Sequence, residues 1–452
     1  MTAAPPDAEL HAYIEAVRRL MARGGYERSG DPADARRWGL AHVRAWLDAH
    51  GSPDARPTVH VAGTKGKGST AAMVEAILRA QGAHTLLLTS PDLHQKRERI
   101  AIDGAAIGHG RFAALAERVL SDEQTAAWSL FEVVTIMGWL AGAEAGCEWH
   151  VLEVGLGGRL DTTNAVREKA VAVITPIDLE HTAILGDTIA LIAAEKAGII
   201  TGPCDVVVAP LRASALDVVR ARAQEMGATL HEVAIECAIR RDAHNLDGQE
   251  LSLRTLLRTY RRMKLPLVGA HQSENAATAV LAAERAIASL GGEIDEAAVR
   301  EGLASVRCPG RFEVVRRRPL TVLDGAHTPL AARRLRQALD AVGVPGRRVF
   351  VLGMLAGKDV ERFTQELIGE QDEVIVATPQ SERAADPGEL VRALQATGVL
   401  AQRAPDVASA LERALALAGE RRAVIVTGSL YTVAEAREEL LGVVGDRAFG
   451  LR

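Results

Sequence analysis

The stretch His60-Val61-Ala62-Gly63-Thr64-Lys65-Gly66-Lys67-Gly68-Ser69-Thr70 decides the fold of this chain. A β-branched run over 58–61 predicts a strand before the glycines, and the apolar spacing over 71–78 predicts a helix after them. Glycines in the turn let backbone N–H groups face an anion, the helix N-terminus adds positive potential, and Lys67 can reach outer phosphates. The stretch therefore predicts a phosphate-binding loop in an α/β domain.

This loop departs from the commonest nucleotide-binding pattern at one position. Gly68 separates Lys67 from Ser69, whereas that pattern places Ser or Thr directly after the lysine. A glycine-rich turn of an ordinary α/β protein is the alternative interpretation. The flanking strand and helix are those that a phosphate-binding loop requires, so they favour the functional interpretation.

The composition is that of an ordinary globular protein. The chain has 452 residues, 48% of them hydrophobic and 25% charged, which predicts two or three domains with sizeable cores. A net charge of −5 indicates neither a nucleic-acid nor a membrane-surface partner. No secretory signal or membrane span is recognisable, and the scattered Cys147, Cys204, Cys237 and Cys308 include no CxxC pair. These features predict a cytoplasmic protein without a zinc site.

Strands and helices are expected to alternate along the first part of the chain. Near-continuous apolar strands between helices predict a mostly parallel sheet that is covered on both faces. A segment rich in arginine, 230–268, predicts a small antiparallel insert, and a long helix follows to about 290. The expected helices are 9–20, 33–50, 129–142 and 189–198, and the expected strands are 85–88, 150–154, 171–175 and 206–209.

Alternation begins again after Cys308-Pro309-Gly310-Arg311, which is interpreted as a domain joint. The second part predicts a smaller α/β domain, with strands at 320–323, 349–352, 373–377 and 423–427 and a helix at 329–341.

Several polar residues stand where a parallel sheet binds ligands. Ser90 follows the strand 85–88, and ligands collect at the carboxyl ends of such strands. Glu153 lies inside an apolar strand, where a carboxylate is costly unless it is paired or bound to a metal. The charged segment 95–100 is, by itself, typical of a solvated face.

Several of these segments, in this order, resemble one family. With the phosphate loop, the chain resembles folylpolyglutamate synthase and dihydrofolate synthase of the Mur ligase superfamily over nearly its whole length. The resemblance implies an N-terminal P-loop ATPase domain at 1–308, a Rossmann-like C-terminal domain at 309–452 and an active site between them. It rests on Thr89-Ser90-Pro91, Val151 to Asn164, Glu195-Lys196-Ala197-Gly198-Ile199, His271-Gln272 with Asn275, Pro309-Gly310-Arg311-Phe312-Glu313 and Asp324-Gly325-Ala326-His327.

The reaction that this resemblance implies is ATP-dependent amide formation. A carboxylate of dihydropteroate or a reduced folate takes the γ-phosphoryl group, and the amine of L-glutamate then displaces phosphate. The resemblance also implies a monomer that needs neither nucleic acid nor membrane. It assigns ATP to Gly66, Lys67, Gly68, Ser69, Asn275, Arg311 and Asp324, and catalytic roles to Lys67, Lys196, His181, Asp324 and His327.

A magnesium site is implied by the same resemblance, with Ser90, Glu153 and His181 as ligands and a second Mg²⁺ nearby. Lys196 matches a lysine that the family carbamylates, and an amine in a dry pocket loses its proton more easily. A loop histidine at the surface and a helix-surface lysine paired with a glutamate are the respective alternatives.

The pterin side is also implied by family position. Glu132 and Asp161 could accept hydrogen bonds from an amino-pyrimidine, with ordinary helix capping and packing as the alternative. The implied substrate residues are Ser129, Leu130, Phe131, Glu132, Leu160, Asp161 and Thr162.

Departures from the family pattern concern substrate preference more than chemistry. Lys65 stands where the family commonly has Asn and adds a cation at the loop; Asp92 replaces His, Glu180 replaces Asp, and Thr328 replaces Asn. A Mur-type ligase for another carboxylate and amino acid, a nucleotide-binding scaffold without catalysis, and a nucleic-acid-dependent ATPase are the alternatives. The last predicts a basic balance or stacking aromatics, which the sequence lacks.

Overall fold

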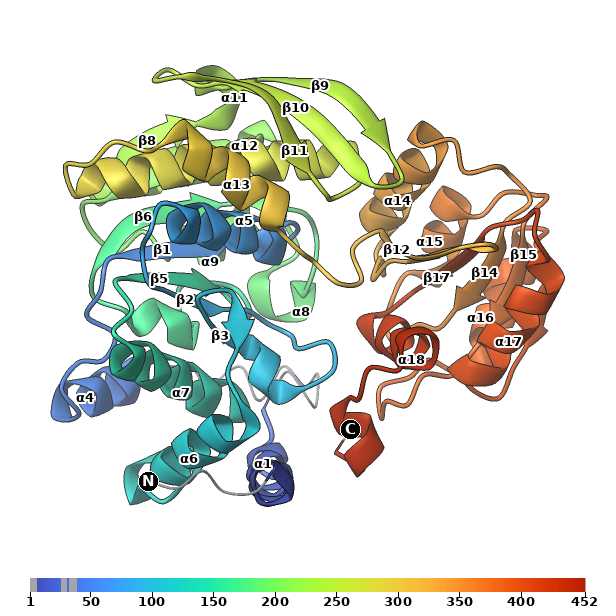
Figure 1. The fold of residues 1–452 in the computed structure, drawn as a ribbon, viewed down its shortest axis with the longest axis horizontal. Helices are drawn as coiled ribbons and strands as arrows, with labels where there is room; N and C mark the ends of the chain where they lie inside the picture. Colours follow the sequence, from blue (N-terminus) through green and yellow to red (C-terminus); the bar gives the residue numbers. More distant parts are fainter. Residues whose placement is uncertain (1–5, 26–30, 32–38, 452) are drawn as a thin grey trace.

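An eight-stranded sheet forms the frame of the first half of the chain, in a computed structural model that describes residues 6–25, 31 and 39–451 (Figure 1). Its strand order is β4-β3-β2-β5-β1-β6-β7-β8, and all neighbours from β2 to β8 are parallel. The strands are β1 (Thr58–Ala62), β2 (Thr85–Leu88), β3 (Ile100–Ile102), β4 (Ala105–Ala106), β5 (Trp149–Glu153), β6 (Lys169–Ile174), β7 (Asp205–Val208) and β8 (Thr229–Glu232).

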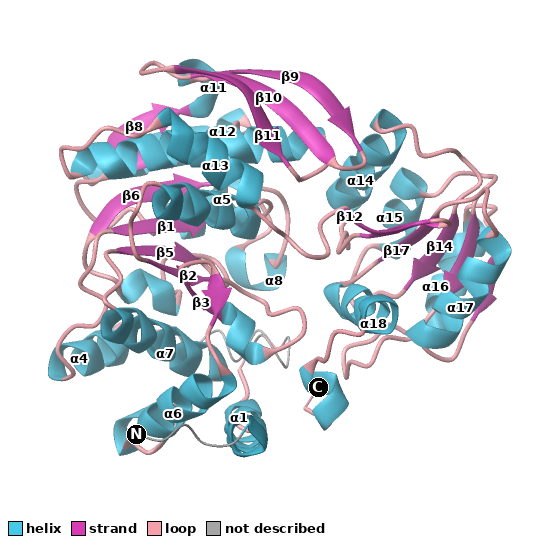
Figure 2. Ribbon diagram, viewed as in Figure 1, coloured by secondary structure: helices cyan, strands magenta, loops and turns pink. Residues whose placement is uncertain are grey.

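Helices cover both faces of this sheet because successive strand side chains point to opposite sides. Val171 and Val173 pack with α5, α12 and α13, whereas Ala172 and Ile174 pack with α9 and α10. Figure 2 shows α5, α12 and α13 on one side of this sheet and α7 on the other. Near the β2 edge, a third apolar cluster joins the sheet to α1, α4, α6 and α7. The helices are α1 (Pro6–Met21), α4 (Ala41–Ala49), α5 (Lys67–Ala80), α6 (His109–Leu120), α7 (Leu130–Ala145), α8 (Thr182–Leu185), α9 (Ile189–Ala197), α10 (Ala213–Glu225), α12 (Ala270–Ser289) and α13 (Glu296–Ser305).

A three-stranded antiparallel sheet between β8 and α12 confirms the predicted insert. Its strands are β9 (Ala238–Asn245), β10 (Gly248–Arg254) and β11 (Thr259–Leu265), and it packs with α12 and α13. The predicted insert began at residue 230, which is wrong by a few residues. Residues 229–232 form β8 of the large sheet, and the short helix α11 (Val233–Glu236) follows.

The second half of the chain builds a six-stranded sheet of its own, in the order β12-β13-β17-β14-β15-β16. Only β12 runs antiparallel, as a hairpin with β13. The smaller Rossmann-like α/β unit is therefore confirmed. Its elements are β12 (Glu313–Arg317), β13 (Leu320–Leu323), α14 (Pro329–Ala341), β14 (Val349–Leu352), α15 (Val360–Leu367), β15 (Glu373–Val376), α16 (Pro387–Ala396), β16 (Ala401–Arg403), α17 (Val407–Ala418), β17 (Val424–Thr427) and α18 (Leu430–Leu441).

Two local predictions need correction. A helix was expected over 33–50, but 39–40 are not helical and α4 begins at Ala41; residues 33–38 lie outside the described part of the chain. The charged segment 95–100 is not a solvated face. Lys96 and Arg99 are buried because both pair with Asp92, at 2.7 Å in each case.

Residues 442–451 leave α18 and return to the first half of the molecule (Figure 1). Within the short turn Asp446–Phe449, the carboxylate of Asp446 is fully buried and accepts from the Tyr13 hydroxyl at 2.8 Å and from the Lys96 N–H at 2.9 Å. Leu451 enters the apolar cluster of α1, α6 and α7. The two halves therefore meet at this tail as well as at the joint near Pro309.

Among the helices of the described residues, none combines the length and the apolar character needed to cross a bilayer.

Candidate active site

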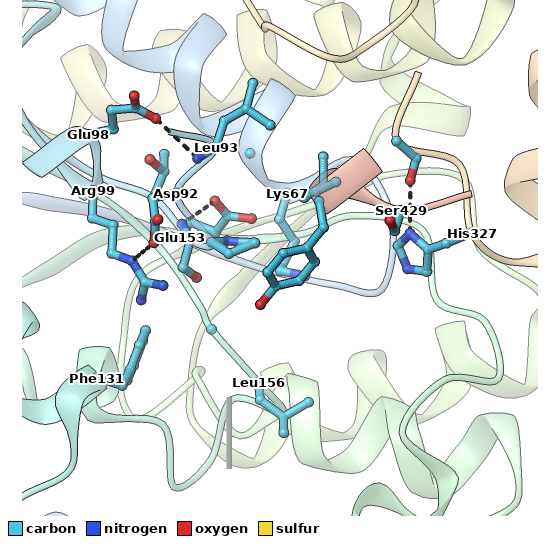
Figure 3. Close-up of a pocket in the computed structure, with 18 of the residues that line it drawn as sticks. Lys67, Asp92, Leu93, Glu98, Arg99, Phe131, Glu153, Leu156, His327 and Ser429 are labelled. Atoms are coloured by element: carbon cyan, nitrogen blue, oxygen red, sulfur yellow. Dashed lines mark hydrogen bonds and ion pairs between the residues drawn. The ribbon is translucent and has the colours of Figure 1, made fainter. Parts of the chain in front are cut away.

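A cavity of about 1390 Å³ lies where the two halves face each other. The phosphate loop, the Ser90 segment and the N-terminus of α7 line it from the first half. The segment 307–312, the loop after β13 and the start of α18 line it from the second half. Figure 3 shows Lys67 and Glu153 from the first half and His327 and Ser429 from the second around this space.

The phosphate loop needs its glycines for steric reasons. Gly63 and Gly66 have φ values of 152° and 89°, a region that side chains rarely adopt. A Cβ at Gly63 would lie 1.9 Å from Thr175 Oγ1, and one at Gly66 would lie 2.5 Å from Asn275 Oδ1. Asn275, on the first turns of α12, therefore touches the loop at the place where α5 begins.

Glu153 ends β5 directly beside this loop. Its carboxylate is 7% exposed, and a Cβ at Gly68 would lie 3.1 Å from its Oε2. The Ser90 N–H donates to the same oxygen at 3.1 Å. Burial raises the pKa of Glu153, while Lys67 and the Ser90 N–H oppose that rise. A buried carboxylate with so few donors is a suitable ligand for a cation.

His181 lines the same cavity from the N-terminus of α8, with φ at +54°. Burial lowers the pKa of its imidazole to about 4, so the ring is neutral at pH 7 and one nitrogen can accept or ligate. Ser90, Glu153 and His181 thus line one cavity. In the described part of the chain, however, no three His, Cys, Asp or Glu side chains gather closely enough to hold a metal by themselves.

Lys196 lies under the phosphate loop, near the C-terminus of α9. Its side chain is 4% exposed, and Nζ donates to the Gly63 carbonyl at 2.8 Å. Burial lowers the pKa of this amine to about 7, with Lys67 adding to the effect. The neighbouring Glu195 pairs with Arg159 instead. The alternative of a helix-surface lysine paired with a glutamate is therefore wrong.

Three polar residues of the second half line the cavity: Arg311, Asp324 and His327. Asp324 accepts from the N–H groups of Phe312 and Ala326 at 2.8 and 2.9 Å, and burial raises its pKa against the opposing charge of Arg311. His327 lies with Nδ1 2.9 Å from the Gly325 carbonyl and Nε2 3.2 Å from Glu180 Oε1. The last contact joins the two halves.

Residues of the predicted pterin site all line the cavity. Glu132 also caps α7, since Oε2 accepts from the Ser129 N–H and hydroxyl at 2.7 Å each, and Oε1 lies 2.7 Å from His42 Nε2. Asp161 accepts from the N–H groups of Thr163 and Leu156, both at 3.0 Å. Both carboxylates are therefore already engaged within the protein, as the capping interpretation expects.

Sequence reasoning missed several residues of this cavity. Lys65 was expected to add a cation toward the phosphates, but its ammonium binds both oxygens of Glu180 at 3.0 Å. The sequence marks Glu180 only as a departure from the family pattern, which commonly has Asp at this position. Residues 428–431, between β17 and the start of α18, were assigned no role, and the available signal was a polar residue, Ser429, shortly after a strand. The remaining missed lining residues include His42, Trp128, His271, Arg334, Ser429, Tyr431 and Arg437.

Family models match both halves. Residues 61–283 match the Mur ligase middle domain, and residues 310–430 match the Mur ligase glutamate ligase domain.

Curated relatives resemble the chain over nearly its full length. It is 34% identical to dihydrofolate synthase/folylpolyglutamate synthase of Mycobacterium tuberculosis over 96% of each protein, and 30% identical to the Bacillus subtilis protein of that name over 90% of this chain and 98% of the relative.

Solved structures of similar proteins also match the chain over nearly its full length. A Mycobacterium tuberculosis folylpolyglutamate synthase complexed with ADP and AMPPCP has a TM-score of 0.86 at 34% identity, covering 96% of this chain and 99% of that one. E. coli FolC in complex with DHPP and ADP has a TM-score of 0.78 at 30% identity, covering 97% and 98%. The chain belongs to the folylpolyglutamate synthase/dihydrofolate synthase family of ATP-dependent Mur ligases.

Proposed function

We propose that this enzyme uses ATP to join L-glutamate to the carboxylate of dihydropteroate or of a reduced folate. The observation that carries the proposal is one cavity lined by a phosphate loop and a buried carboxylate from the first half and by Arg311, Asp324 and His327 from the second. Relatives at about one-third identity whose names state both synthase activities support this choice of substrates.

The chemistry proceeds in two transfers. A carboxylate oxygen of the pterin substrate attacks the γ-phosphorus of ATP, the bond to the β–γ bridging oxygen breaks, and ADP leaves. The glutamate amine then attacks the carbonyl carbon of the acyl phosphate, loses a proton, and phosphate leaves with the C–O bond electrons. Two anions must approach in line, so the protein contributes positioning and positive charge.

Phosphate binding falls to the N–H groups of Gly66, Gly68 and Ser69 at the start of α5, with Lys67 reaching the outer phosphates. Asn275 contacts the nucleotide next to Gly66. Arg311 and Asp324 approach from the second half. His327, which contacts Glu180, the partner of Lys65 in the phosphate loop, would face the transferring group.

Glu153, Ser90 and His181 fit a magnesium ion by chemistry: a buried carboxylate with few donors, a hydroxyl and a neutral imidazole line one wall of the cavity. They supply fewer ligands than Mg²⁺ requires, which suits an ion that keeps waters and binds phosphate oxygens. When bound, Mg²⁺ would offset the charge on the phosphates. We also propose that a second Mg²⁺ binds beside Lys196.

Lys196 would carry a carbamate. Its amine is buried, and burial lowers its pKa to about 7, so the neutral, nucleophilic form is far more accessible at neutral pH than for an exposed lysine. The amine attacks CO₂ and releases a proton, which turns a buried cation into an anion that suits a magnesium ion. Carbonate-free buffer should lower activity, bicarbonate should restore it, and ¹³C NMR should show a carbamate resonance that Lys196→Arg lacks. Unchanged activity and no such resonance would exclude the modification.

The pterin would lie against Ser129, Leu130 and Phe131 at the start of α7. Leu160, Asp161 and Thr162 would face it from the loop after β5. The internal hydrogen bonds that Glu132 and Asp161 accept would hold both carboxylates in place beside the pterin. Capping and packing within the protein are therefore compatible with binding of the pterin.

The organisation of the whole chain follows the same family pattern. We place the domain boundary at 308/309, with the hinge near Pro309, and expect a monomer acting in the cytoplasm.

The deciding experiment measures ATP- and Mg²⁺-dependent phosphate release with L-glutamate, adding either 7,8-dihydropteroate or a tetrahydrofolate monoglutamate. Product mass is read in parallel, with Lys67→Ala as the control. Turnover of both acceptors identifies a bifunctional enzyme, and turnover of one identifies the single activity. A folded protein that binds ATP but forms no glutamate adduct would refute the folate assignment and leave an amide ligase for another carboxylate and amino acid.

A further inference from the structure

Lys65 and Glu180 form an ion pair that neither the phosphate loop nor the metal ligands account for. The Lys65 ammonium lies 3.0 Å from both oxygens of Glu180, and the two side chains are 15% and 12% exposed. The pair lines the cavity beside Lys67. A bidentate pair with so little solvent contact is held far more tightly than a surface pair.

The backbone around this pair is tied together independently. The N–H groups of Thr64 and Lys65 both donate to the Pro176 carbonyl, at 2.9 and 3.1 Å. The Thr64 hydroxyl donates to the Asp178 carbonyl and accepts from the Asp178 N–H. The first half of the phosphate loop and the segment 176–180 therefore move as one unit. Within that unit the Lys65 side chain points to Glu180.

Glu180 also reaches the second half of the molecule. Its Oε1 lies 3.2 Å from Nε2 of His327, whose Nδ1 is held at 2.9 Å by the Gly325 carbonyl. A carboxylate of the first half thus orients an imidazole of the second. Lys358, also from the second half, approaches the same oxygen at 4.0 Å.

Charge explains why the pair is needed. An unpaired carboxylate at this position would repel a triphosphate in the neighbouring loop. With Lys65 bound to both oxygens, the net charge of the pair is zero, while Glu180 keeps an oxygen contact to His327.

We infer that Glu180 is a positioning residue that sets the His327 imidazole beside the phosphate loop, and that Lys65 acts on ATP indirectly, by cancelling the charge of Glu180. The inference rests on the proposed ligase reaction for the role of His327 and on geometry alone for the role of Lys65. It predicts that the two residues affect different quantities. Loss of Lys65 lowers the affinity for the nucleotide unless Glu180 is also replaced, whereas loss of the Glu180 carboxylate lowers kcat.

The test compares Lys65→Met, Glu180→Gln and the double variant with the wild type. Dissociation constants for a fluorescent methylanthraniloyl-ATP are measured without acceptor, and kcat and KM with acceptor and glutamate. Lys65→Met should weaken nucleotide binding about 10-fold because Glu180 then loses its bidentate partner and keeps only the more distant Lys358, at 4.0 Å. The double variant should bind to within about 3-fold of wild type. Glu180→Gln should bind normally, but its kcat should fall about 10-fold.

Arg212→Gln is the matched control. Arg212 pairs with Asp178 of the same segment at 3.7 Å, is largely exposed and does not line the cavity. It should leave binding and turnover unchanged, and thermal melting should show all variants folded.

Two results would overturn the inference. If the double variant binds nucleotide as weakly as Lys65→Met, Lys65 contacts ATP directly. If Glu180→Gln keeps the wild-type kcat, Glu180 does not position His327. Should the wild type turn over no folate acceptor, the proposed function fails, while nucleotide binding still decides the role of Lys65.

Discussion

Lys67 occupies the first position of α5, where the helix N-terminus and the ammonium converge on the space over the phosphate loop. Lys67→Ala removes the ammonium that we propose to neutralise the outer phosphates, so kcat should fall by at least about 100-fold. Phosphate release measures the change. Lys264→Ala, on the exposed face of β11, is the control and should retain full activity. Turnover by Lys67→Ala near the wild-type rate would remove this lysine from the mechanism.

Burial of Lys196 makes stability depend on pH. The folded pKa is about 7 against an ordinary value of 10.5, so between these values the unfolded chain holds a proton that the folded chain lacks. Wild-type stability should therefore rise relative to Lys196→Met from pH 7 toward 10, by up to about 1.4 kcal/mol per pH unit. Urea unfolding in carbonate-free buffer tests this. Parallel curves for the two proteins would show that the amine is charged in the folded state.

At the scale of residues, the sequence predicted the side chains whose position follows from a motif. Lys67 follows from the glycine-rich loop, Glu153 from its place in an apolar strand and Asp324 from the family resemblance, and all three line the cavity. The partners of Lys65 could not be predicted, because Glu180 lies more than a hundred positions away and its identity depends on how two loops meet. Burial of Lys96 and Arg99 was missed although their partner Asp92 is near in sequence, because a charged run alone does not show that its side chains fold inward or that the distant tail covers Lys96.

Among the elements, α5 and α13 make an unusually close contact. A Cβ at Gly302 of α13 would lie 2.6 Å from Ile77 Cα of α5, and backbone atoms cannot yield as a side chain can. Gly302→Ala should therefore destabilise the protein by about 1–3 kcal/mol, although alanine is the better helix former. Urea unfolding gives the difference. Gly202→Ala, where no atom lies within 4 Å of the added Cβ, should leave the free energy of unfolding unchanged. If Gly302→Ala were equally stable, α5 and α13 could move apart without cost.

Long elements with clear periodicity were predictable, and short ones at edges were not. The helix predicted over 329–341 is α14 without change, because Thr328 caps it and Pro329 begins it. The strands β3, β4 and β16 have only two or three residues, too few to establish a pattern. They form because a neighbouring strand offers free backbone groups, which depends on the tertiary fold.

For the whole molecule, the tail contact between Tyr13 and Asp446 should be a measurable part of stability. Tyr13→Phe leaves a fully buried carboxylate oxygen without its donor and should cost about 1–3 kcal/mol. Urea unfolding checks this, and Asp446→Asn alone and combined with Tyr13→Phe completes a double-mutant cycle. Additive effects in that cycle would mean that the two side chains do not interact.

The two-domain organisation followed from the restart of alternation after residue 308, but the second contact between the halves did not. Nothing in the sequence of 442–451 marks it as a segment that crosses back, because it is about as apolar as the rest of the chain and its partners belong to α1 and the segment 94–96. The cavity has its shape because both halves are held against each other there.

This returning tail restricts how the molecule can open. A body held at one point can swing in any direction, whereas a body held at two points turns about the line that joins them, as a door does on its hinges. Here the joint at Pro309 and the anchored Asp446 are two such points, and the contacts of Glu180 with His327 and Lys358 add a third tie between the halves. Opening of the cavity about the line through Pro309 and Asp446 would therefore first have to release the contacts of Glu180.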